Sequence, residues 1–168
     1  EAANSTFTGN TLTGTGRGIY ANNAENSVIS NNTVDTNGSD AFDMDYCHNC
    51  VFDGNIVTGK PSLGFEVRWS DNTTFSNNTL DVMDWGFNCQ DGNAYTFDNN
   101  TITDFNEYGI NFQCSENSTV TDNYILSGSD GGWKSGMKND CGSEQNVFVS
   151  GNYINITNTD YRDDHLYG

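Results

Sequence analysis

The chain has 168 residues, of which 34% are hydrophobic, and it carries 6 Lys and Arg against 23 Asp and Glu, a formal net charge of −17 at pH 7. This length favours a single domain over residues 1–168, and the acidity argues against nucleic acid or an anionic membrane surface as a partner. No apolar stretch approaches the roughly 18 residues of a transmembrane helix, so we expect no membrane span.

A short motif recurs along the whole chain, beginning with FTGNTL at residues 7–12 and reading apolar-x-x-Asn-x-apolar. Its successive copies are separated by 22, 23, 23, 22, 23 and 29 residues. The central residue of each copy is Asn10, Asn32, Asn55, Asn78, Asn100, Asn123 and Asn152. Repeats of this length indicate units that stack on one another to bury a continuous core.

A second motif follows in each period, in which a small residue precedes an apolar-x-apolar triplet. It occurs at residues 18–21, 41–44, 64–67, 86–89 and 109–112, with a degraded copy at 136–139. Alternation of this kind predicts a strand with one buried face. Most of the extra length in the last repeat lies between the two motifs, at residues 127–135.

Short strands in a period of 22–23 residues predict an all-β, right-handed parallel β-helix of about seven coils. Stacked at about 4.8 Å, the recurring Asn side chains would bond to one another and form a ladder. A second ladder is predicted six residues earlier, with Asn72 and Asn117 pointing inward. Its members are Asn4, Asn26, Asn49, Asn72, Asn117 and Asn146, with Asn93 near the same slot.

With these repeats the chain resembles the right-handed parallel β-helix proteins of the pectin-lyase-like superfamily. The resemblance covers nearly the whole chain and implies the fold. It leaves the function open, because this fold carries lyases, hydrolases, epimerases, sugar-binding modules and inert fibres. The characteristic motifs of the polygalacturonase-like, pectate lyase and mannuronan epimerase-like members are missing, which favours a non-catalytic role.

The outward positions of the second strand carry the candidate chemistry, because catalytic members of the superfamily commonly place active residues there. Asp43, Asp45, Glu66 and Arg68 occupy neighbouring coils. If the protein is an enzyme, these four are the expected catalytic residues, with the carboxylates as acid and base. Asp43, Asp45 and Glu66 could instead bind Ca²⁺ through oxygen ligands. The favoured interpretation is a solvated face with an ion pair between coils, without catalysis or cofactor.

Five cysteines suggest an extracellular protein with disulfides. A bond across one turn, Cys47–Cys50, is favoured over half of a zinc site, and a Cys114–Cys141 bond is expected between adjacent coils. Cys89 is expected to be buried and free, with a Cys89–Cys114 bond as the alternative.

Two further surface features follow from the register. Tyr46 and Trp69 share a column, where an internal aromatic stack is favoured over a platform for sugars. Outward Asn residues within sequons are glycosylation candidates, whereas the inward ones are not. These candidates are Asn31, Asn77 and Asn99.

No capping helix is evident at either end of the sequence. With Tyr161 as the last anchor, the chain spans close to a whole number of coils. Open ends at matching phase predict an extracellular structural protein that stacks head to tail into a filament of its own copies. The alternatives are a polysaccharide-active or glycan-binding β-helix, and a fragment of a larger β-helix protein.

Overall fold

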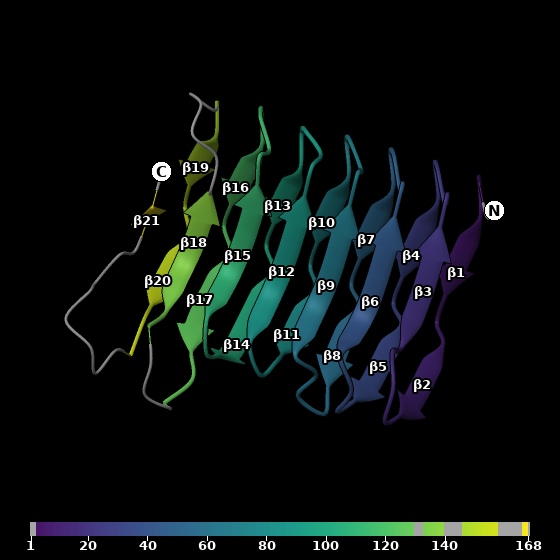
Figure 1. Cartoon of the computed structure of the whole chain (residues 1–168), viewed down its shortest axis with the longest axis horizontal. Helices are drawn as coiled ribbons and strands as arrows, with labels where there is room; N and C mark the ends of the chain where they lie inside the picture. The colour runs from purple at the N-terminus through teal and green to yellow at the C-terminus, as the bar shows by residue number, and fades with distance from the viewer. Residues whose placement is uncertain (1–2, 130–132, 140–145, 158–165, 168) are drawn as a thin grey trace.

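A computed structural model of the chain describes residues 3–129, 133–139, 146–157 and 166–167. These residues form 21 strands and no helix. The strands wind into one elongated stack, with the N-terminal coil at one end and the last coils at the other (Figure 1). The predicted right-handed parallel β-helix is therefore confirmed.

Each coil contributes one strand to each of three parallel sheets, and each sheet has seven strands, as the seven predicted coils require. The first sheet contains β1 (Thr6–Thr8), β4 (Val28–Ser30), β7 (Val51–Asp53), β10 (Thr74–Ser76), β13 (Thr96–Asp98), β16 (Thr119–Thr121) and β19 (Phe148–Ser150). The second sheet contains β2 (Thr11–Gly14), β5 (Thr33–Thr36), β8 (Ile56–Thr58), β11 (Thr79–Asp81), β14 (Thr101–Phe105), β17 (Tyr124–Ser127) and β20 (Tyr153–Asn155).

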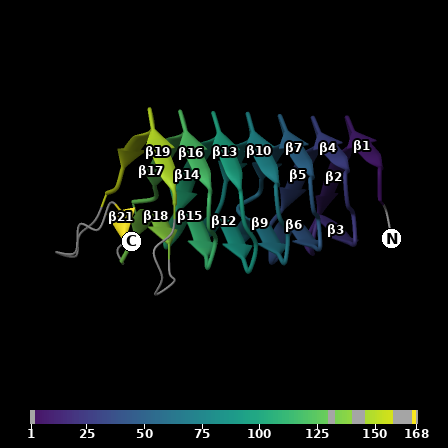
Figure 2. The same ribbon diagram turned by 90° about the horizontal axis from the view of Figure 1, so that it is seen from above.

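The third sheet holds the longest strands, and all of its strands but the last are built from the second motif. It contains β3 (Ile19–Asn22), β6 (Asp40–Asp45), β9 (Leu63–Arg68), β12 (Trp85–Gln90), β15 (Tyr108–Gln113), β18 (Ser135–Asn139) and β21 (Leu166–Tyr167). A view from above places this sheet along one long side of the stack (Figure 2).

Equivalent apolar residues lie one above another inside the stack. Phe52, Phe75 and Phe97 stack with ring centroids 5.2 and 5.1 Å apart, and all three are fully buried. The same column continues with Ile29 and Val120 on either side, and Phe7 and Val149 occupy it in the outermost coils. Because apolar residues at these positions recur in every coil, the core is one continuous column.

The asparagine ladder forms as predicted, at the turn between the first and second sheets. Asn78 Oδ1 accepts hydrogen bonds from the backbone N and from Nδ2 of Asn55, at 2.9 and 3.0 Å. Asn78 donates in the same way to Asn100, and its Nδ2 also donates to the carbonyl of Phe52 at 2.9 Å. The ladder satisfies backbone groups that turn away from the sheets.

The second asparagine column was predicted to point inward, and that prediction is wrong. Asn72 and Asn117 are exposed, and their φ angles are +51° and +56°. Left-handed backbone at this corner turns the side chain outward, so the next residue, such as Thr73, is the buried one. Asn49 and Asn26 still form a ladder here, but it lies on the surface.

The last coil also differs from the prediction. β21 places Leu166 opposite Met137, so Tyr161 is not the anchor of this coil, and Tyr161 itself lies outside the described residues. The chain therefore does not complete a whole number of coils in the predicted register. The spacing rule failed because Leu166 follows Met137 by 29 residues, more than the 22 or 23 of the earlier repeats.

The cysteine predictions fare differently. Cys47 and Cys50 form the expected disulfide, and both are buried. Cys89 is free and buried, so the alternative Cys89–Cys114 bond is wrong. The predicted Cys114–Cys141 bond involves Cys141, which lies outside the described residues, and it stays a prediction.

Candidate functional site

The outer face of the third sheet carries the polar residues that the sequence singled out. Strand register places Asp43 beside Glu66 and Asp45 beside Arg68, so the four candidate residues lie on two adjacent strands, β6 and β9. The intervening residues Phe42 and Met44 are buried in the core. The alternation of the strand thus separates an apolar inner side from a charged outer one.

Arg68 holds the three carboxylates of this face together. Its Nη2 lies 2.7 Å from Asp43 Oδ1, its Nε 2.7 Å from Asp45 Oδ1 and its Nη1 2.8 Å from Glu66 Oε1. Asp43 is fully buried beneath these contacts. The favoured interpretation was partly right, because the ion pair between coils exists, but the face is not fully solvated.

Two residues missed by the sequence reasoning complete the network. Arg17 Nη1 lies 2.8 Å from Asp43 Oδ2, and Arg17 Nε lies 3.4 Å from Asp40 Oδ2. Asp40 is the first residue of β6, two positions before the apolar anchor of that coil. In the sequence, the only sign of this role was that Asp40 directly precedes Ala41, the small residue of the second motif.

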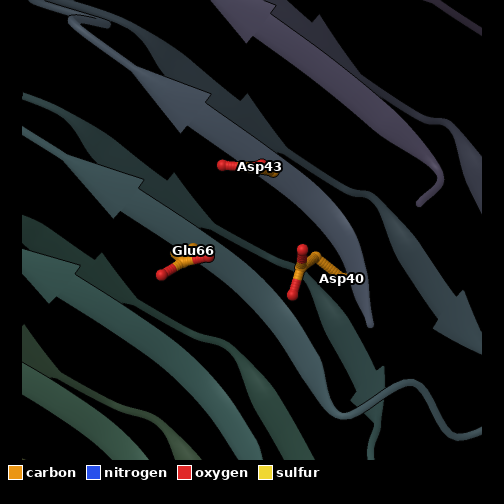
Figure 3. A group of neighbouring side chains, drawn as sticks. All are labelled: Asp40, Asp43 and Glu66. Carbon is orange, nitrogen blue, oxygen red and sulfur yellow. The ribbon is translucent and has the colours of Figure 1, made fainter. Parts of the chain in front are cut away.

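Figure 3 shows a group of three neighbouring carboxylates, from Asp40 and Asp43 on β6 and Glu66 on β9. One oxygen of each lies within 4.8 Å of the others, a spacing that a divalent cation could bridge. The sequence had proposed Asp45 in place of Asp40 for such a Ca²⁺ site. Because both oxygens of Asp43 already face arginines, a cation here would have to displace them.

Burial and the arginines act on these carboxyls in opposite directions. Desolvation raises the pKa of Asp43 and of Glu66, although Arg68 opposes the change in both. The hydrogen bond with Asp45 raises the pKa of Arg68 further, so the guanidinium stays charged. The face therefore combines a permanent cation with carboxyls that protonate more readily than usual.

Beyond the acidic network the same face carries amide and aromatic groups, with Lys138 as a nearby cation. Asn111 Nδ2 donates to Asn88 Oδ1 at 3.0 Å, and both side chains are buried. Tyr108 lies beside them, with Trp85 and Trp133 packed edge-on against its ring at 5.1 and 5.3 Å. This part of the third sheet offers aromatic and amide groups.

Tyr46 and Trp69 lie at the turn that follows β6 and β9. Their rings stack with centroids 5.2 Å apart and an interplanar angle of 19°. The prediction of an internal stack is wrong, because the two residues are 41% and 42% exposed. The Arg68 guanidinium lies 6.0 Å from the Trp69 ring, so the pair adjoins the acidic network.

The three glycosylation candidates occupy the positions expected of them. Asn31, Asn77 and Asn99 are exposed and have φ angles of +53°, +55° and +52°. Asn99 Nδ2 donates to Asn77 Oδ1, and Asn77 Nδ2 donates to Asp53 Oδ1, both at 2.7 Å. The geometry makes the side chains accessible, and their glycosylation stays a prediction.

Among the described residues no helix is long and apolar enough to cross a membrane.

Comparisons with known proteins agree with the fold. A search of curated proteins and a search of solved structures each found no match. The family model of the right-handed β-helix region matches residues 1–160. The chain therefore belongs to the right-handed β-helix family.

Proposed function

We propose that the chain is an extracellular, non-catalytic β-solenoid that binds neutral glycan chains at the Tyr46–Trp69 pair and the neighbouring polar face of the third sheet. The observation that carries this proposal is the exposed, stacked aromatic pair beside charged and amide groups. The buried Cys47–Cys50 disulfide supports an oxidising, extracellular setting.

The backbone gives the aromatic pair its significance. The equivalent positions in the flanking coils are Asn23 and Asp91, and all four residues have φ between +52° and +56°. Asn and Asp tolerate this left-handed conformation, whereas Tyr and Trp adopt it at a cost of about 1 kcal/mol or more each. Costly residues that are also exposed point to a function beyond folding.

The ligand class follows from the chemistry around the pair. Both rings are partly exposed, and an exposed aromatic ring suits the apolar side of a sugar ring. Asp45 and Arg68 adjoin the pair, while Gln90 follows Arg68 in register, so hydroxyl groups would find donors and acceptors. A polyuronate would meet a chain with a net charge of −17, which favours neutral sugars.

The test is a titration of the protein with neutral and uronate polysaccharides. Tryptophan fluorescence and affinity electrophoresis measure the binding. We expect binding of at least one neutral glycan and a loss of roughly tenfold or more in affinity for Tyr46→Ala and Trp69→Ala. Tyr124→Ala is the matched control, because Tyr124 and Tyr153 form another exposed stack, with centroids 4.9 Å apart. Equal losses in all three variants would refute the site.

Polysaccharide cleavage is the second candidate, because the raised pKa of Glu66 suits a general acid. Against it, Arg68 contacts Asp43, Asp45 and Glu66 at once, so none of these carboxylates is free to act as a base. Product analysis with Asp43→Ala and Glu66→Ala separates the two roles. Turnover that disappears in both variants would make the protein an enzyme.

A further inference from the structure

None of the three tryptophans of this chain lies in the buried core, whose aromatic residues are mostly phenylalanines. All three instead occupy the outer side of the third sheet. Trp69 adjoins Arg68 there, with 6.0 Å between the guanidinium and the ring. Trp85 and Trp133 pack edge-on against Tyr108. Because a tryptophan at the surface presents a large apolar ring with few rotatable bonds, this distribution points to a ligand on this face.

Trp85 is the first residue of β12, and two neighbours hold its ring in place. Its Nε1 donates to Glu107 Oε2 at 2.8 Å, and Tyr108 meets the ring edge-on, with centroids 5.1 Å apart. These contacts leave the residue partly exposed. The Lys138 ammonium, which is in register with Asn111, lies 4.9 Å from the Tyr108 ring, and this contact places the cluster on the outer face. A ring that is fixed before a ligand arrives loses little freedom on binding.

The strand β12, in the middle of the stack, leads from Trp85 to Trp69 (Figure 1). The backbone N of Trp69 donates to the carbonyl of Gln90, the last residue of β12, at 2.9 Å. Gln90 follows Trp85 by five positions, so a strand rise of about 3.3 Å per residue separates the two tryptophans by about 17 Å along the strand. Both rings therefore lie beside one strand, near its two ends.

The outward residues of β12 between the two rings are uncharged amides. In register, Asn88 follows Glu66 of β9, and Gln90 follows Arg68, so the charges of the acidic network end at this strand. The side-chain amide of Gln90 is partly exposed and makes no hydrogen bond to any residue that the structure describes. Its donor and acceptor groups are available to the hydroxyl groups of a neutral ligand.

We propose that Trp85 is a second aromatic contact for the neutral glycan, so that one chain several sugars long lies along β12 from Trp85 to the Tyr46–Trp69 pair. This inference rests on the proposed function and adds a path and a minimum length to its ligand. A disaccharide is too short to reach both rings. A longer chain reaches both, and because its second contact is intramolecular, its affinity exceeds that of either contact alone.

Calorimetric titration with cello-, manno- and xylo-oligosaccharides tests this path, with each sugar supplied as a disaccharide and as a hexasaccharide. We expect the hexasaccharide of at least one of these sugars to bind about tenfold or more tightly than its disaccharide, with one chain per protein molecule. Trp85→Ala should weaken hexasaccharide binding by about tenfold or more and leave disaccharide binding nearly unchanged. Tyr124→Ala, in the exposed stack on the second sheet, is the control and should change neither.

A conservative variant separates the contact with the ligand from support of the fold. Trp85→Phe keeps an aromatic ring at this position, so we expect it to retain most of the affinity for the hexasaccharide. Circular dichroism checks that each variant keeps the β-solenoid.

Three results would overturn the inference. Hexasaccharide binding that Trp85→Ala leaves unchanged and Trp69→Ala removes confines the ligand to the Tyr46–Trp69 pair, and the proposed function then stands without the second contact. Equal losses for the two chain lengths in Trp85→Ala would mean that this residue only supports the fold. If no oligosaccharide binds, this inference and the proposed function fail together.

Discussion

Individual residues at one interior corner of the solenoid show how successive coils fill the same buried space with different side chains. At the turn between the third and first sheets, two buried positions face each other. The successive pairs are Ala24–Ser27, Cys47–Cys50, Ser70–Thr73, Gly92–Tyr95 and Ser115–Ser118. A disulfide, two small hydroxyl side chains or one large ring can each occupy the corner, so the fold accepts several residue pairs at this position.

In the Gly92–Tyr95 pair, the missing side chain of the glycine leaves room for the large tyrosine ring. A Cβ atom on Gly92 would collide with the Tyr95 hydroxyl and with the Ser70 carbonyl. We expect Gly92→Ser to lower the free energy of unfolding by about 1–3 kcal/mol through overpacking. We expect Tyr95→Ser to lower it by about 3–5 kcal/mol, because a fully buried ring is lost.

The double variant should recreate the Ser115–Ser118 corner of the next coil. We expect it to be more stable than the sum of the two single changes by about 1–2 kcal/mol, since each substitution relieves part of the other's defect. Urea unfolding of the four proteins gives this coupling energy. Strict additivity would show that the two residues do not share the corner.

The ladder is an element whose stability depends on repetition. Asn78 is fully buried and joins Asn55, Asn100 and the Phe52 carbonyl. Its neighbour Asn77 is exposed, and the equivalent position in the preceding coil is Gly54, with φ of +63°. Adjacent asparagines in one turn therefore have different roles, one in the interior and one at the surface.

This difference predicts the outcome of a matched pair of substitutions. Asn78→Ala leaves buried donors and acceptors unpaired above and below it, so we expect it to lower the free energy of unfolding by roughly 3–5 kcal/mol. Asn77→Gly keeps a backbone that glycine adopts easily, so we expect a change within about 0.5 kcal/mol. Urea midpoints measure both, and equal losses would contradict the assigned roles.

At the scale of the whole molecule, repetition made most of the fold predictable. The ladder Asn recurs in all seven coils and the strand anchors in all but the last, so the copies together fixed the register. Asp40 and Arg17 lie outside the repeating motif and join the acidic network through side chains that cross between coils. The outward turn of Asn72 and Trp69 depends on a positive φ at the corner, which residue spacing alone does not reveal.

In this acidic chain, stability depends on pH through its carboxyl groups. Two kinds of carboxyl change the stability in opposite directions as the pH rises. The raised pKa of Glu66 means that the folded chain binds its proton more tightly than the unfolded chain does. Its contribution to stability is fully present below the unfolded pKa of 4.5 and is lost as pH rises through the higher folded pKa. Asp53 behaves in the opposite way, because hydrogen bonds from Ser76 and Asn77 lower its pKa.

Two isosteric variants separate these contributions. Compared with the original chain, Glu66→Gln should gain melting temperature as pH rises from about 4.5 towards 7, because it lacks the carboxyl that is costly to ionise when buried. Asp53→Asn should lose melting temperature relative to the original chain as pH rises through about 4, because the hydrogen-bonded carboxylate stabilises the fold only when ionised. Thermal unfolding from pH 3 to pH 7 measures both slopes. Slopes of the same sign in the two variants would contradict the opposite environments of these carboxyls, and would mean that net charge alone governs the acid stability of the solenoid.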